Sequence, residues 1–160
     1  MIGDGMFTDK ATRTPKKTNE RRKMKVRFQK KHPFAVIPTR ATPGSAGYDL
    51  TAVSMEDTPT CYKYHLGIAL EIPPGYAGFV FPRSSLAKKG AWMSNSIGLL
   101  DSDFRGEISA CFYNFGNPPY KPGDRVAQLI IMPVPEIEFE EADELSKTER
   151  GEGSYGSTGR

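Results

Sequence analysis

One stretch decides the fold of this chain: Leu66-Gly67-Ile68-Ala69-Leu70-Glu71-Ile72-Pro73-Pro74-Gly75-Tyr76-Ala77-Gly78-Phe79-Val80-Phe81. Up to Ile72, large apolar residues alternate with smaller or polar ones, which is the two-residue period of a β-strand. Pro73-Pro74-Gly75 is a turn signal, and the apolar run after it is typical of a second strand. The stretch therefore predicts a strand, a turn and a strand.

The rest of the chain repeats this short, turn-bounded pattern. Strands are predicted over 106–115, 124–134 and 137–142, with turn signals at Asn117-Pro118-Pro119 and Pro122-Gly123 between the first two. Only residues 84–89 favour even a short helix. Many short strands separated by turns favour a double-sheet, all-β architecture over a parallel α/β sheet.

Length and composition fit one domain with a modest core: 160 residues, 38% of them hydrophobic and 26% charged. The net charge of +3 is uneven, because residues 1–32 carry +8 and the rest carry −5. We expect residues 1–24 to be a basic, disordered, dispensable leader, 25–142 the β domain and 143–160 a flexible arm. A nuclear-localisation signal, a weak nucleic-acid contact and an expression remnant stay open for the leader.

The cysteines indicate the compartment. Cys61 and Cys111 are far apart in the sequence and lack a Cys-x-x-Cys spacing, so neither a disulfide framework nor a zinc site is indicated. No segment has the long apolar run of a secretory signal or a membrane span. We expect an intracellular, cytoplasmic protein, nuclear if the host is eukaryotic, with no membrane partner.

Two predicted strands indicate an oligomer. Residues 108–115 and 126–132 are apolar on both faces, and a solvated outer face would be costly. In a domain of this size the expected cover is another copy of the chain. Residues 136–149 hold seven carboxylates, which favours an edge strand leading into an exposed linker.

The C-terminal stretch 150–160 combines glycines, arginines, hydroxyls and the ring of Tyr155, with no apolar period. Glycines let backbone N–H groups approach a ligand, arginine binds phosphate oxygens, and a tyrosine offers a flat face for a base. These features indicate an arm that closes over a nucleotide. By composition alone an ordinary disordered Gly/Ser terminus is favoured, and the other segments reverse that preference.

Two internal segments carry the chemistry. The first is Pro82-Arg83-Ser84-Ser85-Leu86-Ala87, which follows a predicted strand and opens a helical turn. The backbone N–H groups, hydroxyls and guanidinium at the start of such a turn can bind an anion. The alternative is an ordinary Ser-capped turn with a surface arginine. The segment 95–106 indicates a hairpin whose backbone could read the edge of a pyrimidine, with Asp101 taking a proton from water. An Asp-rich turn with Phe104 in the core is its alternative.

Five segments in order resemble the five motifs of the trimeric deoxyuridine triphosphatases (dUTPases). They are Ala46-Gly47-Tyr48-Asp49-Leu50, Pro82-Arg83-Ser84-Ser85-Leu86-Ala87, Gly98-Leu99-Leu100-Asp101-Ser102-Asp103-Phe104-Arg105-Gly106, Gly123-Asp124-Arg125-Val126-Ala127-Gln128-Leu129 and Arg150-Gly151-Glu152-Gly153-Ser154-Tyr155-Gly156-Ser157-Thr158-Gly159. The match runs from about Pro38 to the end, and five motifs in register are a strong signal.

The resemblance implies a jelly-roll-like, distorted β-barrel that forms a homotrimer, with each active site built from three chains. The first, second and fourth motifs come from one subunit, the third from a neighbour and the fifth from the remaining one. The implied reaction is hydrolysis of dUTP to dUMP and pyrophosphate. This reaction keeps uracil out of DNA and supplies dUMP for thymidylate synthesis.

The resemblance also implies residue roles. Asp101 is the general base that activates water for attack on the α-phosphorus. Asn95 and the backbone around Gly98 and Leu100 read uracil. Phe104 lies beneath the deoxyribose and leaves no room for a 2′-hydroxyl.

The implied phosphate ligands come from three motifs. Arg83, Ser84, the Ser85 amide and Gln128 hold the α- and β-phosphates. In the arm, the ring of Tyr155 stacks on the base, and three residues close over the γ-phosphate: Arg150, Ser157 and Thr158.

Mg²⁺ is the implied cofactor. Asp49 is expected to contact the ion indirectly, through metal-bound water. The chain departs from the usual motifs at Ser85, where glycine is frequent, at Phe104, where tyrosine is common, and at Ser154-Tyr155, where Gly-Phe is usual. Phe104 and Tyr155 keep an aromatic ring where the family has one. Ser85 and Ser154 carry a side chain, so the backbone there can approach the substrate less closely than glycine would allow.

Two alternatives stay open. A dCTP deaminase of related fold would need a glutamate acid/base and recognition of the 4-amino group, and the third and fifth motifs argue against it. A non-catalytic, nucleotide-binding regulatory trimer is disfavoured by an intact Asp101 and a complete arm.

Overall fold

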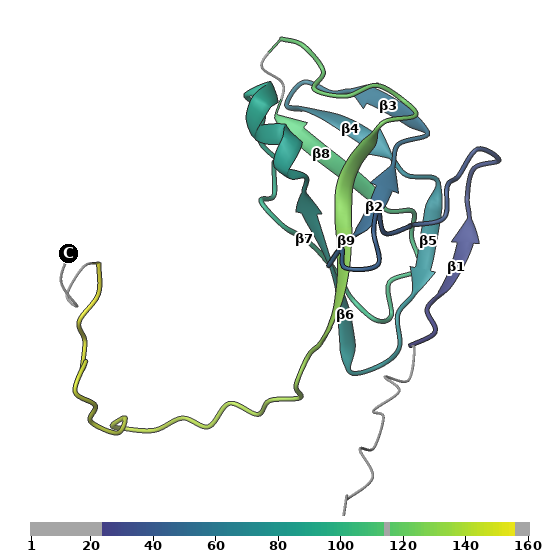
Figure 1. The fold of residues 1–160 in the computed structure, drawn as a ribbon. Coiled ribbons are helices and arrows are strands. Elements are labelled where there is room, and N and C mark those ends of the chain that lie inside the picture. The colour runs from purple at the N-terminus through teal and green to yellow at the C-terminus, as the bar shows by residue number, and fades with distance from the viewer. Residues whose placement is uncertain (1–23, 114–115, 156–160) are drawn as a thin grey trace, which may run out of the picture.

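The computed structural model describes residues 24–113 and 116–155 (Figure 1). Within these ranges every regular element except one short 3₁₀ helix is a β-strand, which confirms the all-β class. The elements are β1 (Arg27–Lys30), β2 (Tyr48–Thr51), β3 (Ser54–Asp57), β4 (Cys61–His65), β5 (Ile68–Glu71), β6 (Tyr76–Pro82), the 3₁₀ helix η1 (Ser84–Lys89), β7 (Gly98–Leu100), β8 (Ser109–Tyr113) and β9 (Arg125–Pro133). Among the described residues, no helix is both long and apolar enough to span a bilayer.

The described strands form three antiparallel sheets rather than one closed barrel. Their orders are β1-β5, β2-β9-β6-β7 and β3-β4-β8. In the four-stranded sheet, β9 lies between β2 and β6, so segments far apart in the sequence become neighbours. This order places parts of three of the sequence motifs side by side.

The predicted strand, turn and strand are confirmed as β5 and β6, but the two strands do not pair with each other. β5 pairs with β1, whereas β6 pairs with β9 and β7. The chain changes sheets at Pro73-Pro74-Gly75, where Gly75 has φ of +80° and the Tyr76 N–H donates to the Pro73 carbonyl at 3.2 Å. Proline cannot donate to a ladder, and glycine adopts positive φ without strain, so the sequence ends one sheet here.

One apolar core joins all three sheets. At its centre, the rings of Tyr64 and Phe112 meet edge to face with centroids 5.7 Å apart, and Tyr120 packs against both. Full burial of a large apolar side chain contributes roughly 1.5–3 kcal/mol, so these rings are major contributors to stability. The other fully buried large side chains are Leu50, Leu66, Ile68, Ile72, Val80, Ile108 and Val126.

The remaining sequence predictions have mixed outcomes. Residues 106–115 and 124–134 contain β8 and β9, and residues 84–89 form η1, as predicted. The strand predicted over 137–142 is wrong for the single chain: the segment is extended and exposed, and it leaves the body of the domain (Figure 1). An edge strand needs a partner for its N–H and C=O groups, and this segment runs away from every sheet of its own chain.

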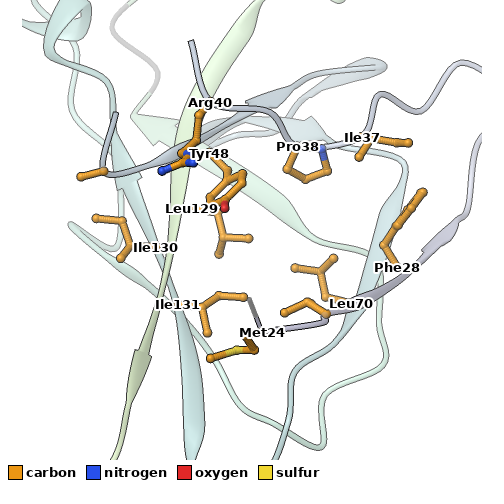
Figure 2. A pocket seen from close by; sticks show the side chains of 12 residues that line it. Met24, Phe28, Ile37, Pro38, Arg40, Tyr48, Leu70, Leu129, Ile130 and Ile131 are labelled. Atoms are coloured by element: carbon orange, nitrogen blue, oxygen red, sulfur yellow. The ribbon is translucent and has the colours of Figure 1, made fainter. Parts of the chain in front are cut away.

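An apolar pocket of about 560 Å³ lies where the N-terminal segment approaches β5 and β9 (Figure 2). Met24 lies in its wall, although the sequence placed this residue in the leader. None of the predicted site residues lines the pocket. Its apolar wall contains Met24, Val26, Phe28, Ile37, Leu70, Leu129, Ile130 and Ile131.

Candidate active site

The sheet order brings the first, second and fourth motifs together. Asp49 in β2 lies opposite Gln128 in β9, and Gln128 lies opposite Phe81 in β6. Because β6 ends at Pro82, Arg83 follows directly beside this row. The three strands therefore place Asp49, Arg83 and Gln128 at one end of the sheet.

Asp49 is the centre of this cluster and the one charged side chain found buried among the described residues, at 6% exposure. Its Oδ1 accepts a hydrogen bond from Arg83 Nε at 3.1 Å, and its Oδ2 accepts one from Arg125 Nη1 at 2.9 Å. Gln128 Nε2 lies 3.4 Å from Oδ1. Two guanidinium groups around one carboxylate leave a net positive charge, which suits a phosphate.

Arg83 is held in place at both ends. Its Nη1 donates to the Arg125 carbonyl at 3.2 Å, and its side chain is only 22% exposed. Gly47 lies beside Gln128, because a Cβ added to it would stand 3.1 Å from Cβ of Gln128. A larger residue at position 47 would press on Gln128, so the glycine of the first motif has a packing reason.

η1 confirms the predicted helical turn after β6. Arg83 is extended, with φ −82° and ψ 148°, and its carbonyl accepts from the Leu86 N–H at 2.9 Å. Leu86 is buried in the core and anchors the turn, while Gly90 ends it in the left-handed region. Ser84 and Ser85 thereby occupy the first turn, next to Arg83.

The Asp101 loop follows β7 at the edge of the same sheet. The Phe104 N–H donates to the Asp101 carbonyl at 3.2 Å, and Arg105 Nη1 donates to the carbonyls of Ser102 and Phe104 at 2.7 and 2.9 Å. These bonds close residues 101–105 into a compact turn. The Asp101 carboxylate and the Phe104 ring are both exposed at its surface.

Gly106 lies under the ring of Phe104. A Cβ added at position 106 would stand 2.5 Å from Cζ and 2.7 Å from Cε2 of that ring. Any other residue would push the ring away, so glycine here determines where the ring lies. At the start of β7, Asn95 Nδ2 is 3.6 Å from the point where a Cβ of Gly98 would stand, which places the amide beside the strand.

The predicted hairpin is correct only in part. β7 pairs with β6, and the chain after the Asp101 turn crosses to β8 in another sheet. The turn before β7 does exist: the Ser96 N–H donates to the Met93 carbonyl at 3.0 Å, and Ser96 has φ of +58°. The segment is thus an edge strand between two turns.

Within one chain, Asp101 and Arg83 lie near opposite ends of β6. Leu100 is opposite Gly78, five residues before Arg83. A strand rises about 3.3 Å per residue, so the offset along β6 is about 16 Å. The Arg83 guanidinium also turns toward Asp49 in β2, the edge strand farthest from β7. The structure therefore does not bring the predicted base and the phosphate ligands of one chain together.

The arm extends away from the body of its own chain (Figure 1). Arg150 Nε donates to the Gly153 carbonyl at 2.9 Å, and Tyr155 is fully exposed. The predicted ligands Ser157 and Thr158 lie outside the described residues. None of the described arm residues joins the rest of the predicted site.

The Asp49 carboxylate suits contact with Mg²⁺ through a water molecule. Among the described residues, no group of three or more His, Cys, Asp or Glu side chains could hold a metal ion. Both Asp49 oxygens already accept from guanidinium groups, but a carboxylate has about four acceptor positions, so a metal-bound water can still donate to it. Mg²⁺ keeps several waters and takes ligands from phosphates, which fits such a site.

Sequence reasoning missed Arg125 and Arg105. Arg125 is the second cation on Asp49, and Arg105 closes the Asp101 turn. Both stand inside the quoted motifs, and Arg125 opens an otherwise apolar strand. A charged residue at the first position of such a strand is the signal that could have identified it.

Comparison with known proteins shows which family the chain belongs to. The dUTPase family model matches residues 34–159. The deoxyuridine 5′-triphosphate nucleotidohydrolase of Desulfitobacterium hafniense is 43% identical over 146 residues, which cover 86% of this chain and 96% of that protein. The protein of the same name from Gloeobacter violaceus is 44% identical over 135 residues, covering 80% and 91%.

Solved structures share the fold. A mutant dUTPase of Staphylococcus bacteriophage 80alpha with dUpNHpp has a TM-score of 0.72 at 23% identity, covering 85% of this chain and 99% of that one. A mutant dUTPase of phage phi11 of S. aureus, described as revealing the coordination of a structural Mg(II) ion, has a TM-score of 0.63 at 20% identity, covering 76% and 98%. At these identities the likeness concerns the fold alone.

Proposed function

Because this chain belongs to the dUTPase family and hydrolyses dUTP, we propose that its phosphate ligands and its Asp101 loop serve different active sites of a homotrimer. The strongest support is their arrangement along β6, where Leu100, the residue before Asp101, lies opposite a position about 16 Å from Arg83. In this proposal each site takes the Asp49 cluster from one chain, the Asp101 loop from a second and the arm from the third.

The Asp49 cluster binds the α- and β-phosphates. Asp49 fixes the guanidinium of Arg83 and the amide of Gln128, so these donors are ordered before substrate arrives. Ordered donors bind the transition state without first losing conformational freedom. Ser84 and the Ser85 amide, in the turn beside Arg83, complete the contacts.

Asp101 accepts a proton from the attacking water. The water oxygen bonds to the α-phosphorus, and the bond to the bridging oxygen of the β-phosphate breaks, which releases pyrophosphate and leaves dUMP. General-base catalysis of this kind contributes about 10²–10⁴-fold. The turn closed by Arg105 holds Asp101 in a fixed position for this step.

The same loop selects the nucleoside. Asn95 and the backbone of Gly98 and Leu100 read uracil, and the Phe104 ring excludes a 2′-hydroxyl. The Phe104 ring packs directly against Gly106, so it has no space to move toward the backbone when a 2′-hydroxyl approaches. The arm then closes the site, with Tyr155 on the base and three ligands on the γ-phosphate: Arg150, Ser157 and Thr158.

Mg²⁺ is the proposed cofactor, held by the substrate phosphates and by water bound to Asp49. When bound, it neutralises phosphate charge and favours one conformer of the triphosphate.

Exposed apolar residues support the trimer. Tyr48 and Ile37, at the rim of the apolar pocket, are 42% and 50% exposed, and Val134, directly after β9, is 45% exposed. Between β9 and the arm, Ile137 and Phe139 alternate with glutamates and are 66% and 90% exposed. Such surfaces are costly in water and suit contact with other copies of the chain.

We also propose an intracellular, reducing compartment, in the cytoplasm or in the nucleus of a eukaryotic host. Cys61 and Cys111 support it, because they are free thiols on the neighbouring strands β4 and β8. Burial and contact with Cys61 raise the pKa of Cys111 to about 11, so this thiol stays protonated at neutral pH.

The reaction is tested with dUTP, dCTP and dTTP in the presence and absence of Mg²⁺, measuring pyrophosphate, nucleoside monophosphate and ammonia. We expect pyrophosphate and dUMP from dUTP, with a large loss of rate when the metal is chelated. Ammonia from dCTP would indicate a deaminase, and nucleotide binding without any product would indicate a regulatory trimer.

A further inference from the structure

Glu107 anchors the chain where it leaves the Asp101 loop. Its Oε1 accepts a hydrogen bond from the Gly67 N–H at 2.8 Å. Gly67 lies between β4 and β5, in a different sheet from the strand that enters the loop. Glu107 also directly follows Gly106, the residue that packs against the Phe104 ring. The Glu107 side chain therefore ties the end of the loop to a second part of the domain.

The segment that receives Glu107 is itself fixed. Gly67 has φ of +66°, in the left-handed region, and a Cβ added to it would stand 2.8 Å from Cβ of His32. Its carbonyl accepts a hydrogen bond from the Lys31 N–H at 2.7 Å. Only glycine fits this conformation and this space without strain. The Gly67 N–H is thus held in one direction, toward Glu107.

His65, the last residue of β4, lies between two carboxylates. Its Nδ1 is 3.4 Å from Oε2 of Glu107, and its Nε2 is 3.6 Å from Oε2 of Glu56 in β3. A neutral imidazole has one N–H and one lone pair, so one of its nitrogens would turn a lone pair toward a carboxylate. An imidazolium has an N–H on both nitrogens and can face both carboxylates. The geometry therefore suits the protonated ring.

Other titratable groups lie close to these three side chains. Lys63 lies opposite Glu56 and shares the outer face of the sheet with His65. Cys111 in β8 lies opposite Lys63, and His32 contacts Gly67 through its Cβ. The imidazole of His65 is 27% exposed and both carboxylates are more exposed than that. Water therefore screens the interactions in part, and we expect a modest effect.

We propose that Glu107 and His65 are positioning residues for Asp101: Glu107 ties the end of the loop to Gly67, and protonated His65 holds the Glu107 carboxylate in place. Histidine side chains change charge between about pH 5 and 8, so the hold is complete at the acid end and weakens as the pH rises. The proposal rests on the proposed role of Asp101 as the general base.

His65→Gln is the first test, made on the assembled protein with Mg²⁺ by measuring kcat for dUTP from about pH 5.5 to 8.5. Glutamine cannot become charged. We expect the variant to be about two- to fivefold slower than wild type at the acid end, as for loss of a partly exposed ion pair. At the alkaline end, where wild-type His65 is neutral, the two rates should be equal. A merely structural role would give the same ratio at every pH, and that result would overturn the proposal.

Glu56→Gln tests the same hold through a gain of activity. The glutamine amide can donate to Nε2 of neutral His65, which leaves the Nδ1–H directed at Glu107. We expect kcat equal to wild type at the acid end and about two- to fivefold higher at the alkaline end. A misfolded variant cannot produce this gain, so its absence would contradict the proposal.

His32→Gln is the matched control, because His32 is the other of the two histidines in the chain and glutamine keeps the Cβ that contacts Gly67. Its rate relative to wild type should stay constant across the pH range. If this control reproduced the pH-dependent ratio of His65→Gln, the effect would not belong to His65 and the proposal would be wrong.

Two further variants separate this proposal from the proposed function. Glu107→Ala should slow the reaction at every pH, and adding His65→Gln should slow it no further, because His65 acts through Glu107. Losses that multiply would overturn this order. If Asp101→Asn kept near-normal turnover, the proposed base would fail and this proposal with it. If Asp101→Asn is inactive and the His65→Gln ratio is constant, the base stands and only the role of His65 and Glu107 is wrong.

Discussion

Asp49 and Arg83 form an ion pair between strands that are not neighbours. The Asp49 carboxylate in β2 accepts from Arg83 Nε at 3.1 Å just beyond the end of β6, and β9 lies between the two strands. Arg125 in β9 shares the same carboxylate. The pair therefore links the three strands that supply the phosphate ligands, and it fixes the direction in which Arg83 points.

Asp49→Asn should weaken substrate binding more than it slows the chemical step. A neutral amide cannot balance two guanidinium groups, and loss of a hydrogen bond to a charged group costs about tenfold or more in affinity. We expect KM for dUTP to rise by that factor, with a lower thermal midpoint. Asp124→Asn, which removes a charge next to Arg125, is the matched control, and equal effects of both would contradict the role of Asp49.

Asp101→Asn should hydrolyse dUTP at least about 10²-fold more slowly while binding dUpNHpp with nearly normal affinity, because only the proton acceptor is lost. The measurement is kcat together with analogue affinity. Asp103→Asn removes the same charge two residues away and should keep most of the activity. Near-normal turnover by the Asp101 variant would exclude it as the base.

Phe104→Ala should raise kcat/KM for UTP relative to dUTP, because the ring is the proposed barrier to a 2′-hydroxyl. Phe104→Tyr keeps the ring face and should keep the discrimination. Unchanged selectivity of the alanine variant in a steady-state comparison would remove the ring from this role.

Gly106→Ala should relax the same selectivity without altering the ring itself. The new Cβ would stand 2.5 Å from Cζ of Phe104, so the ring must move. Gly44→Ala is the control, since no described residue lies within 4 Å of a Cβ there. The outcome to check is the UTP to dUTP ratio at equal thermal stability, and an unaltered ratio in Gly106→Ala would show that the ring is not fixed by this contact.

The long, strongly apolar strands were the predictable part of the fold. β6 and β9 have enough apolar residues and clear turn signals to be identified from sequence. The strands β1 to β4 were not identified individually, because each has four or five residues with mixed polarity. Their strand conformation depends on partners distant in the chain, which periodicity does not reveal.

The candidate site, like the fold, has parts that the sequence predicts and parts that it does not. The motifs predicted which segments carry chemistry, and the turn at Ser84 follows from local sequence. The ion pairs of Asp49 could not be predicted, because they depend on β9 lying between β2 and β6. Nor does the sequence reveal that Gly106 supports the Phe104 ring, since this is a contact between a side chain and a backbone two residues away.

The three-chain site is the central claim, and subunit mixing tests it most directly. Equal amounts of Asp101→Asn and of a chain ended after Lys147 are assembled together, each nearly inactive as a pure trimer. If the loop and the arm of one site come from different chains, each is intact with a chance of one half, so about a quarter of the sites should recover activity.

The measurement is dUTP turnover per site in the mixture, after native mass spectrometry has confirmed that subunits exchange. We expect about a quarter of the wild-type rate. If the loop and the arm came from the same chain, no site would hold both. Activity no higher than that of the two parent variants would then contradict the shared site.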